Sequence, residues 1–262
     1  MNTCCRKRFR SVLAGFCFAV FGICSFGFGL ALLPPFFLLP EIPRRRIAVA
    51  LNRALWKIFS ALMIALRLIS VRQENSEILE SARGAVVVAN HPSLIDVVLL
   101  LAMTPRPVCV VKGALSRNVF MKCVVQVAHL GNDMPPEKFF TKAGSLLNRG
   151  FNIIIFPEGT RTDPDAKPTF HRGAAQLALI AGAKIVPVRI RVSPRILGKR
   201  QKWFHVSERC VRYELRAFPP LAPEDFGGNA EPRHSRAKRI TETLRELLAS
   251  NANCADNPTV SS

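Results

Sequence analysis

The sequence has few acidic residues, and it has no repeat that would make it a fibrous or modular protein. Its 262 residues include 18 Asp and Glu against 37 Lys and Arg, which gives a formal net charge of +19. An excess of this size points to an anionic partner, either anionic lipid or nucleic acid. The lack of a fixed-period repeat excludes collagen, coiled coils and solenoids. Hydrophobic residues make up 49% and charged residues 21%, which excludes a disordered chain and a polytopic transporter.

The eight cysteines form no pattern that indicates a metal site or a disulfide framework. No pair has the spacing of a zinc site, and the cysteines are scattered along the chain. We therefore expect free and mostly buried thiols in a reducing cytoplasm.

An uncharged run from Ser11 to Leu33 stands near the start of the chain. It is long enough to cross a hydrocarbon core as a helix. No small-x-small cleavage site follows it, and neither Cys17 nor Cys24 follows a small residue, so we expect neither a cleaved signal nor a lipoprotein signal. Basic clusters at 6–10 and 44–46 both prefer the cytoplasmic side. A single span and a re-entrant hairpin are both open, with the hairpin slightly favoured.

A second apolar stretch covers residues 47–71. Arg53, Lys57, Ser60 and Arg67 fall near one side of a 3.6-residue helix, and the remaining positions are apolar. This pattern predicts an interfacial amphipathic helix with a narrow basic stripe, and a core helix of the folded domain is the alternative. Either way, we expect the first 71 residues to form a membrane-docking helical segment.

The rest of the chain alternates short apolar runs with stretches of helical pattern. The runs predict buried strands at 85–89, 108–111, 152–156, 184–192 and 210–218. Helices are expected near 94–103, 137–149, 172–182 and 235–249. This order predicts an α/β fold with a mainly parallel sheet flanked by helices. We place that domain at 72–250 and a disordered tail at 251–262.

The motif NHPSLID at 90–96 follows the first of these strands, at the end where ligands of parallel sheets bind. A carboxylate at Asp96 can fix the tautomer of His91 and stabilise its imidazolium, which makes a general base. No nucleophilic side chain is needed if the attacking hydroxyl belongs to the substrate. A capping histidine beside a surface aspartate is the alternative.

The motif FPEGTRT at 156–162 follows the third strand. Gly159 allows a ligand to approach the backbone closely, and Arg161 offers a bidentate fork to phosphate or carboxylate. A turn with a salt bridge is the alternative. Two such motifs at the same end of two apolar strands favour a shared site.

Together, NHPSLID and FPEGTRT resemble the H-x4-D and F-P-E-G-T-R motifs of the PlsC-type glycerolipid acyltransferases, the lysophosphatidate acyltransferase family. The resemblance covers about residues 85–192. It extends to the segment 110–115, which is similar to the family's second block, and to Ile185–Val188, which is similar to the fourth. It implies an O-acyltransferase that moves an acyl chain from acyl-CoA or acyl carrier protein to the free hydroxyl of a lysophospholipid. The acceptor it implies first is 1-acylglycerol-3-phosphate, which would give phosphatidate.

The resemblance also implies roles for residues. His91 is then the general base and Asp96 orients it. Residues that hold the acceptor's glycerol and phosphate are then Lys112, Glu158, Gly159, Thr160 and Arg161. It implies no metal and no cofactor besides the acyl thioester. Family members dock on membranes through N-terminal helices, which suits the first 71 residues. From the compact and basic chain we expect a bacterial protein at the inner membrane, with its catalytic domain on the cytoplasmic side.

One departure from the family concerns the acceptor. The second block usually ends with an arginine that meets the acceptor phosphate, whereas residues 127–133 here read VAHLGND. Candidate substitutes are Lys112, Arg117 and Lys122. Otherwise the acceptor is a different lipid, such as an amino-acid lipid or an aryl-polyene-type lipid. A non-catalytic lipid-binding protein of the same fold is a further alternative, against which the intact His91 and Asp96 argue.

A basic stretch over 189–216 includes the aromatic residues Trp203 and Phe204. A nucleic-acid groove and a membrane-facing basic surface both fit this composition. The apolar N-terminus favours the membrane, so we expect membrane lipids, the lysophospholipid and the acyl donor as partners, and no specific nucleic acid. A carrier-protein dock is a third use. The other histidines are interpreted as structural or surface residues, namely His129, His171, His205 and His234.

Overall fold

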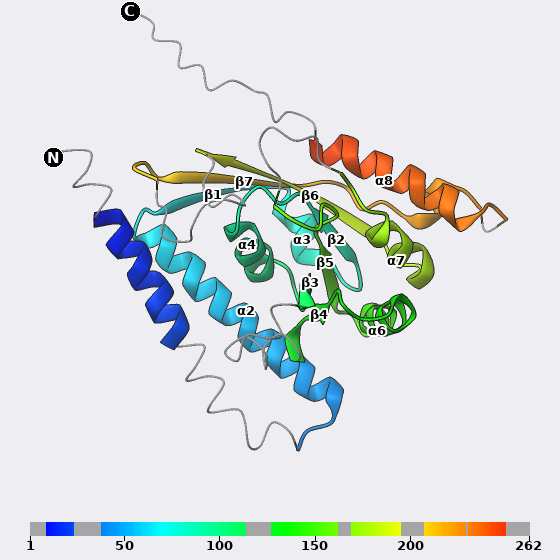
Figure 1. The fold of residues 1–262 in the computed structure, drawn as a ribbon, viewed down its shortest axis with the longest axis horizontal. Helices are drawn as coiled ribbons and strands as arrows, with labels where there is room; N and C mark the ends of the chain where they lie inside the picture. Colours follow the sequence, from blue (N-terminus) through cyan, green and yellow to red (C-terminus); the bar gives the residue numbers. More distant parts are fainter. Residues whose placement is uncertain are drawn as a thin grey trace, which may run out of the picture.

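The computed structural model describes residues 9–23, 38–113, 127–161, 169–194, 207–228 and 230–249. Its centre is a seven-stranded sheet with the order β1-β7-β6-β2-β5-β3-β4 (Figure 1). The strands are β1 (Ile69–Glu74), β2 (Val86–Ala89), β3 (Pro107–Val111), β4 (Leu130–Gly131), β5 (Asn152–Ile155), β6 (Ile185–Ser193) and β7 (Val211–Ala217). Neighbouring strands are parallel except β6 and β7, which are antiparallel. The predicted α/β fold with a mainly parallel sheet is therefore confirmed.

Helices cover both faces of this sheet (Figure 1). They are α2 (Glu41–Ala65), α3 (Ser76–Ser81), α4 (Ile95–Met103), α6 (Pro136–Asn148), α7 (Gly173–Ala181), the short 3₁₀ helix η2 (Pro223–Phe226) and α8 (Arg233–Ala249). One apolar cluster joins α2 and α4 to the sheet, and a second cluster joins α6, α7 and α8 to its other face. Val87 belongs to the first cluster and Val86 and Val88 belong to the second. A strand buried on both faces must be apolar at every position, which explains the unbroken apolar run of β2.

The helix predicted over 47–71 has different bounds in the structure. Helix α2 begins at Glu41 and ends at Ala65, and Arg67 adopts a positive φ of 52° before β1 starts at Ile69. The sequence continues with a helical pattern here, but every residue of β1 pairs with a residue of β7, from Val211 to Arg216, so strand pairing overrides the helical preference. The predicted domain boundary between residues 71 and 72 falls inside this strand.

The predicted basic stripe of this helix also needs correction. Ser60 is buried and donates to the Trp56 carbonyl at 2.8 Å, and Arg67 lies outside the helix. Arg53 donates from Nε to the Ala102 carbonyl at the end of α4. One side of α2 is therefore packed on the folded domain. For that side, the alternative interpretation as a core helix is the correct one.

A shorter apolar helix, Phe9–Ile23, packs beside α2. Phe21 stacks on Trp56 with ring centroids 4.4 Å apart, and Phe18 contacts Phe59 at 5.4 Å. Within the described residues, α2 is the one helix long and apolar enough to cross a membrane. Residues 24–33, on which the choice between span and hairpin depends, lie outside the described residues.

Candidate active site

The two sequence motifs lie at one edge of the sheet. Strand β2 pairs with β5 in parallel, and β5 pairs with β3 in parallel, so the C-terminal ends of all three strands are neighbours. The loop 90–94 follows β2, the loop 156–161 follows β5, and Lys112 follows β3. The structure therefore brings the predicted motifs to the same edge, as expected for ligand sites of parallel sheets.

His91 and Asp96 form a pair at this edge. His91 Nδ1 lies 3.3 Å from Asp96 Oδ2, and the Asp96 side chain is fully buried while 14% of the His91 side chain is exposed. When His91 donates its Nδ1 proton to the carboxylate, Nε2 holds the lone pair. Among the residues that the structure describes, Nε2 has no hydrogen-bond partner, so it is open to accept a proton from a bound molecule.

Asp96 owes its position to the first turn of α4. Its Oδ2 accepts the backbone N–H of Ser93 at 2.6 Å, while Ser93 Oγ accepts the N–H of Ile95 at 3.4 Å. This reciprocal arrangement is similar to a capping box, which satisfies N–H groups that a helix start leaves without partners. The same carboxylate thus closes the helix and holds His91.

Burial dominates the electrostatics of this carboxylate. Burial raises the pKa of Asp96 to about 6, although His91 and the backbone N–H of Ser93 act in the opposite direction. Within the described part of the chain, Asp96 Oδ1 has no hydrogen-bond partner. A buried carboxylate needs hydrogen-bond donors, and the donors that Oδ2 has here are the Ser93 N–H and the His91 ring.

Two residues outside the predicted pair hold the His91 loop. Ser93 Oγ lies 2.9 Å from the hydroxyl of Tyr213, which is fully buried on β7. The side chain of Asn90 donates to the Ile190 carbonyl at 2.8 Å and accepts the Ile190 N–H at 2.7 Å. The loop is therefore fixed to β6 and β7 on one side of β2.

The second motif supports the loop from the other side of β2. Glu158 is buried, and its Oε1 accepts the backbone N–H of His91 at 3.3 Å. The ring of Phe156 lies 4.4 Å from the ring of His91, centroid to centroid. Gly159 has a φ of +65°, a conformation that glycine adopts without strain, and its N–H closes the turn on the Phe156 carbonyl at 3.1 Å. The His171 N–H ties this turn to a later segment by donating to the Pro157 carbonyl at 2.8 Å.

Within the described residues, no hydrogen bond joins His91 to the remaining residues that were predicted to bind the acceptor. Thr160 and Arg161 are half-buried in the same loop as Glu158, and Lys112 is exposed beyond β3, next to Gly113. A side chain at Gly113 would collide with the carboxylate of Asp133, the acid in the stretch that departs from the family. Arg117 and Lys122, the other candidate substitutes for the missing arginine, lie outside the described residues.

Sequence reasoning did not select Tyr213, Asn90 or Phe156. Tyr213 is the one tyrosine of the chain. It stands on an alternating strand, and a buried phenol needs a hydrogen-bond partner, which was a usable signal. Its partner on a distant segment could not be read from the sequence. Asn90 was within the motif, but its bond to β6 requires the strand order.

The arrangement can accept a proton from a hydroxyl and return it to a leaving group. A neutral imidazole with a buried carboxylate on Nδ1 suits general base catalysis. The described residues place no serine or cysteine side chain in hydrogen-bond contact with the His91 imidazole. The nucleophile would therefore come from a bound molecule.

This chain is similar in sequence to known acyltransferases. A family model described as "Acyltransferase" matches residues 70–191. The 1-acyl-sn-glycerol-3-phosphate acyltransferase alpha of Mus musculus is 27% identical over 186 residues, covering 66% of this chain and 64% of the relative. The beta form from Homo sapiens is 31% identical over 175 residues, covering 62% and 61%. This chain thus spans less than two thirds of the length of these curated relatives.

Two further matches are a second kind of lipid acyltransferase and a solved structure. A lyso-ornithine lipid O-acyltransferase of Pseudomonas aeruginosa is 32% identical over 114 residues, covering 39% of this chain and 41% of the relative. The crystal structure of a 1-acyl-sn-glycerophosphate acyltransferase, PlsC, from Thermotoga maritima superposes with a TM-score of 0.68 at 21% identity. That match covers 97% of this chain and 100% of the other, so the two share a fold over nearly their whole lengths.

Proposed function

We propose that this chain is a membrane-associated O-acyltransferase of the PlsC-type glycerolipid acyltransferase family, which its similarity to known acyltransferases supports. It transfers an acyl chain from an acyl thioester, acyl-CoA or acyl carrier protein, to the free hydroxyl of a lysophospholipid. The observation that carries this proposal is the His91–Asp96 pair, whose Nε2 is open at the C-terminal edge of the sheet. No metal and no further cofactor are part of the proposed reaction.

The proposed reaction needs one base and one acid, and His91 serves as both. Nε2 accepts the proton of the acceptor hydroxyl while the oxygen attacks the thioester carbonyl. The tetrahedral intermediate then collapses, the C–S bond breaks, and the imidazolium returns the proton to the thiolate. Asp96 positions His91 and stabilises the imidazolium, since its carboxylate is ionised above a pH of about 6.

The acceptor's glycerol and phosphate are proposed to bind along the 158–161 loop. Glu158 holds the backbone at His91, which places this loop beside the base. Arg161 would provide two parallel donors for a phosphate, and Lys112 would add a cation from the end of β3. The first acceptor to test is therefore 1-acylglycerol-3-phosphate, with phosphatidate as the product.

A lyso-amino-acid lipid is the second candidate acceptor. The stretch 127–133 has Asp133 instead of a phosphate-binding arginine, and this carboxylate is exposed beside Gly113 at the same edge of the sheet. An acid there would favour a headgroup with a cationic amine over a phosphate. The match to a lyso-ornithine lipid O-acyltransferase supports the same direction.

The proposed location is the cytoplasmic side of a bacterial inner membrane. Helix Phe9–Ile23 leaves Phe9, Val12 and Phe16 exposed, and α2 leaves Ile58 exposed. Large apolar side chains gathered on helices at the surface favour docking on lipid. Membrane lipids are then partners, and the free hydroxyl reaches His91 from the bilayer surface.

The test is acyl transfer by membranes that contain the full chain. Lysophosphatidate, other lysophospholipids and a lyso-ornithine lipid would each be offered with acyl-CoA or acyl carrier protein, and the products identified by mass spectrometry. Base catalysis is worth about 10²–10⁴-fold, so we expect His91→Ala to lower transfer by that factor. His234→Ala, on the exposed surface of α8, is the matched control and should leave the rate unchanged.

Each outcome has a definite meaning for the proposal. His91-dependent phosphatidate establishes the first acceptor, and His91-dependent transfer only to the lyso-ornithine lipid establishes the second. Transfer that is equal in His91→Ala and in the unmodified chain contradicts the proposed mechanism. An absence of transfer to every acceptor would favour a lipid-binding protein of this fold.

A further inference from the structure

We propose that a cationic groove on α2, separate from the His91 site, binds the phosphate group of an anionic membrane phospholipid. The groove, here called the α2 groove, has a volume of about 440 Å³. It is lined by Arg46, Val49, Ala50, Arg53, Ala54, Lys57 and Arg106. Four of these seven residues are cations, and none is an acid. The cations suit a phosphate group, and the apolar side chains suit the part of the ligand to which that phosphate is attached.

The α2 groove lies at the opposite end of the sheet from the His91 site. Arg106 directly precedes β3, and its carbonyl accepts the N–H of Asn152 at the start of β5. His91 follows the other end of the neighbouring strand β2. Parallel strands of four or five residues span about 13–17 Å, so one phosphate could not occupy both places. The α2 groove is therefore a second site and not part of the proposed acceptor site.

One cation of the groove is held in place by hydrogen bonds, and the other three are exposed. Arg53 donates from Nε to the Ala102 carbonyl and from Nη2 to the Met103 carbonyl, both at 3.2 Å, which anchors its guanidinium at the end of α4. Arg46, Lys57 and Arg106 are exposed. Within the described residues, none of the three forms a salt bridge with a carboxylate. Their charge is therefore available to a ligand.

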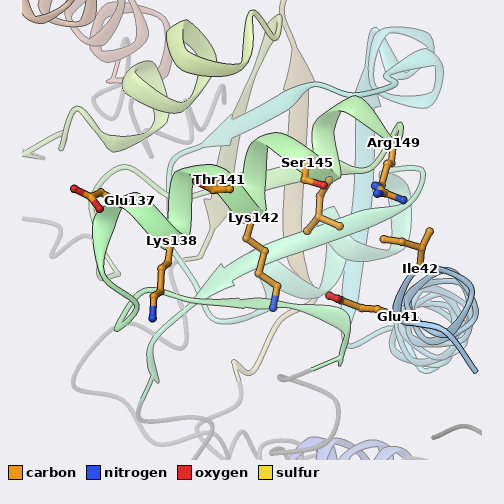
Figure 2. Close-up of a pocket in the computed structure, with 9 residues that line it drawn as sticks. Glu41, Ile42, Glu137, Lys138, Thr141, Lys142, Ser145 and Arg149 are labelled. Atoms are coloured by element: carbon orange, nitrogen blue, oxygen red, sulfur yellow. The ribbon is translucent and has the colours of Figure 1, made fainter. Parts of the chain in front are cut away.

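A second hollow continues this basic surface along α6. It has a volume of about 640 Å³ and lies between α6 and the start of α2. Figure 2 shows Lys138 and Lys142 projecting from one side of α6, with Glu41 of α2 across the hollow. Arg149 also lines this hollow, and the next residue, Gly150, lies close to the α2 groove, since an added Cβ there would lie 3.2 Å from Arg106 Nη1. Cations outnumber acids in the lining of both hollows.

The faces of α2 identify a lipid as the occupant. One face is buried against the domain, including Val49 and Met63, and the opposite face exposes Ile47 and Ile58. At 100° per residue, the three cations that α2 contributes to the groove, Arg46, Arg53 and Lys57, stand about a quarter of a turn from both faces. A helix that places its apolar face among acyl chains holds such an edge at the depth of the headgroup phosphates. A soluble anion would have no use for the adjoining apolar face.

Vesicle flotation of the full chain tests this proposal. The protein would be synthesised in a cell-free reaction with vesicles of phosphatidylcholine alone, or with one quarter phosphatidylglycerol, and the floating fraction measured. The test variant is Arg46→Glu/Lys57→Glu/Arg106→Glu, which leaves Arg53 in place because Arg53 is bonded to α4. Since each basic residue near an anionic surface is worth about fivefold in binding, we expect the preference for phosphatidylglycerol to fall by about 100-fold.

The matched control reverses the same number of charges on α8. Arg233→Glu/Lys238→Glu/Arg245→Glu changes exposed residues on a helix that packs on the other face of the sheet. We expect this variant to keep the preference. An equal loss in both triple variants would mean that net charge alone sets the preference, and it would overturn the proposal. Arg46→Gln/Lys57→Gln/Arg106→Gln guards against misfolding and should also lose the preference.

Further measurements distinguish a lipid headgroup from free phosphate, and lipid binding from acyl transfer. Inorganic phosphate at 20 mM and constant ionic strength should leave flotation unchanged, and displacement by it would overturn the assignment to a lipid headgroup. The unmodified chain floating equally on both vesicles would also overturn the proposal, in favour of an acidic protein as the partner. The proposal does not rest on acyl transfer, because His91→Ala should float as the unmodified chain does.

Discussion

The hydroxyl of Tyr213 lies 2.9 Å from Ser93 Oγ, and both groups are buried. Ser93 in turn donates its N–H to Asp96, the carboxylate that holds His91. A residue of β7 is thereby connected to the proposed base through two side chains. The connection crosses 120 residues of sequence. It gives the fold a direct influence on the position of the imidazole.

Tyr213→Phe should therefore impair acyl transfer through positioning. Removing the hydroxyl leaves Ser93 Oγ without this partner, and the loss of a typical hydrogen bond should lower the free energy of unfolding by about 1 kcal/mol. We expect kcat to fall while KM for the acceptor stays the same, because the acceptor loop 158–161 is untouched. Steady-state kinetics and denaturant unfolding would measure the two effects separately.

A double-mutant cycle makes this prediction sharper. If Tyr213 acts through Ser93, the Ser93→Ala/Tyr213→Phe variant should lose little more activity than either single variant. Fully additive losses would mean that the two residues act independently, and they would contradict the proposed connection.

Asp96→Asn should separate catalysis from stability. Burial raises the pKa of Asp96 to about 6 from an ordinary value of 3.8, so the folded chain binds this proton more tightly than the unfolded chain. The stability that the protonated carboxyl contributes is complete below pH 3.8 and is lost as the pH rises to about 6. Asparagine does not ionise, so the variant should gain stability relative to the unmodified chain across that window, by up to about 3 kcal/mol above it. Acyl transfer should nevertheless fall.

Denaturant unfolding between pH 4 and pH 8 measures this difference. A difference in stability between Asp96→Asn and the unmodified chain that stays constant over this range would show that the buried carboxyl is not the group that titrates. Glu158→Gln is a useful comparison variant, because it also replaces a buried carboxylate by an amide, and the amide oxygen can still accept the His91 N–H.

Gly159→Ala should raise the KM for the acceptor. The φ of Gly159 is +65°, and an L-residue there is strained by about 1–2 kcal/mol, although the nearest side-chain atom, on His171, would leave room for a Cβ. Relief of that strain would shift the 158–161 loop, which the proposed acceptor contacts. Gly182, with a φ of +59° and open space around it at the end of α7, is the matched control. Gly182→Ala should lose similar stability with no change in KM.

His129 should make the fold sensitive to acid. Its Nε2 lies 3.1 Å from the Asn52 amide of α2, and its Nδ1 accepts the N–H of Cys109 at 3.2 Å. Burial, followed by the nearby charge of Arg45, lowers the pKa of His129 from 6.5 to about 4. The unfolded chain then binds this proton more tightly, so the stability that His129 contributes should fall as the pH drops from about 6.5 to 4, opposite in sign to the contribution of Asp96.

His129→Gln is the test of this acid sensitivity. Glutamine can still bond to Asn52 and Cys109 but does not titrate in this range. The variant should therefore lose less stability than the unmodified chain between pH 6.5 and 4. An identical pH dependence in the two proteins would assign the sensitivity to another group.

The sequence alone determined the sheet core and the identity of the proposed catalytic pair. The runs at 85–89 and 152–156 are apolar at nearly every position, because a strand that is buried on both faces has no solvent-facing position for a polar side chain. His91, Asp96 and Glu158 were found because short motifs follow such strands, and parallel strands bring their ends to one edge. These inferences depend on local pattern, which a sequence displays directly.

The tertiary structure decided what depends on partners far away in the chain. The segment from Ile69 is a strand because β7 pairs with it, and the helical pattern before it could not indicate where α2 ends. Tyr213 and Asn90 acquired roles only when β7 and β6 were placed beside the His91 loop. The α2 groove likewise needs Arg106 beside α2, 60 residues after Arg46 in the chain. Hydrogen bonds and charges act over a few ångströms, so their effects follow from distances that only the folded chain defines.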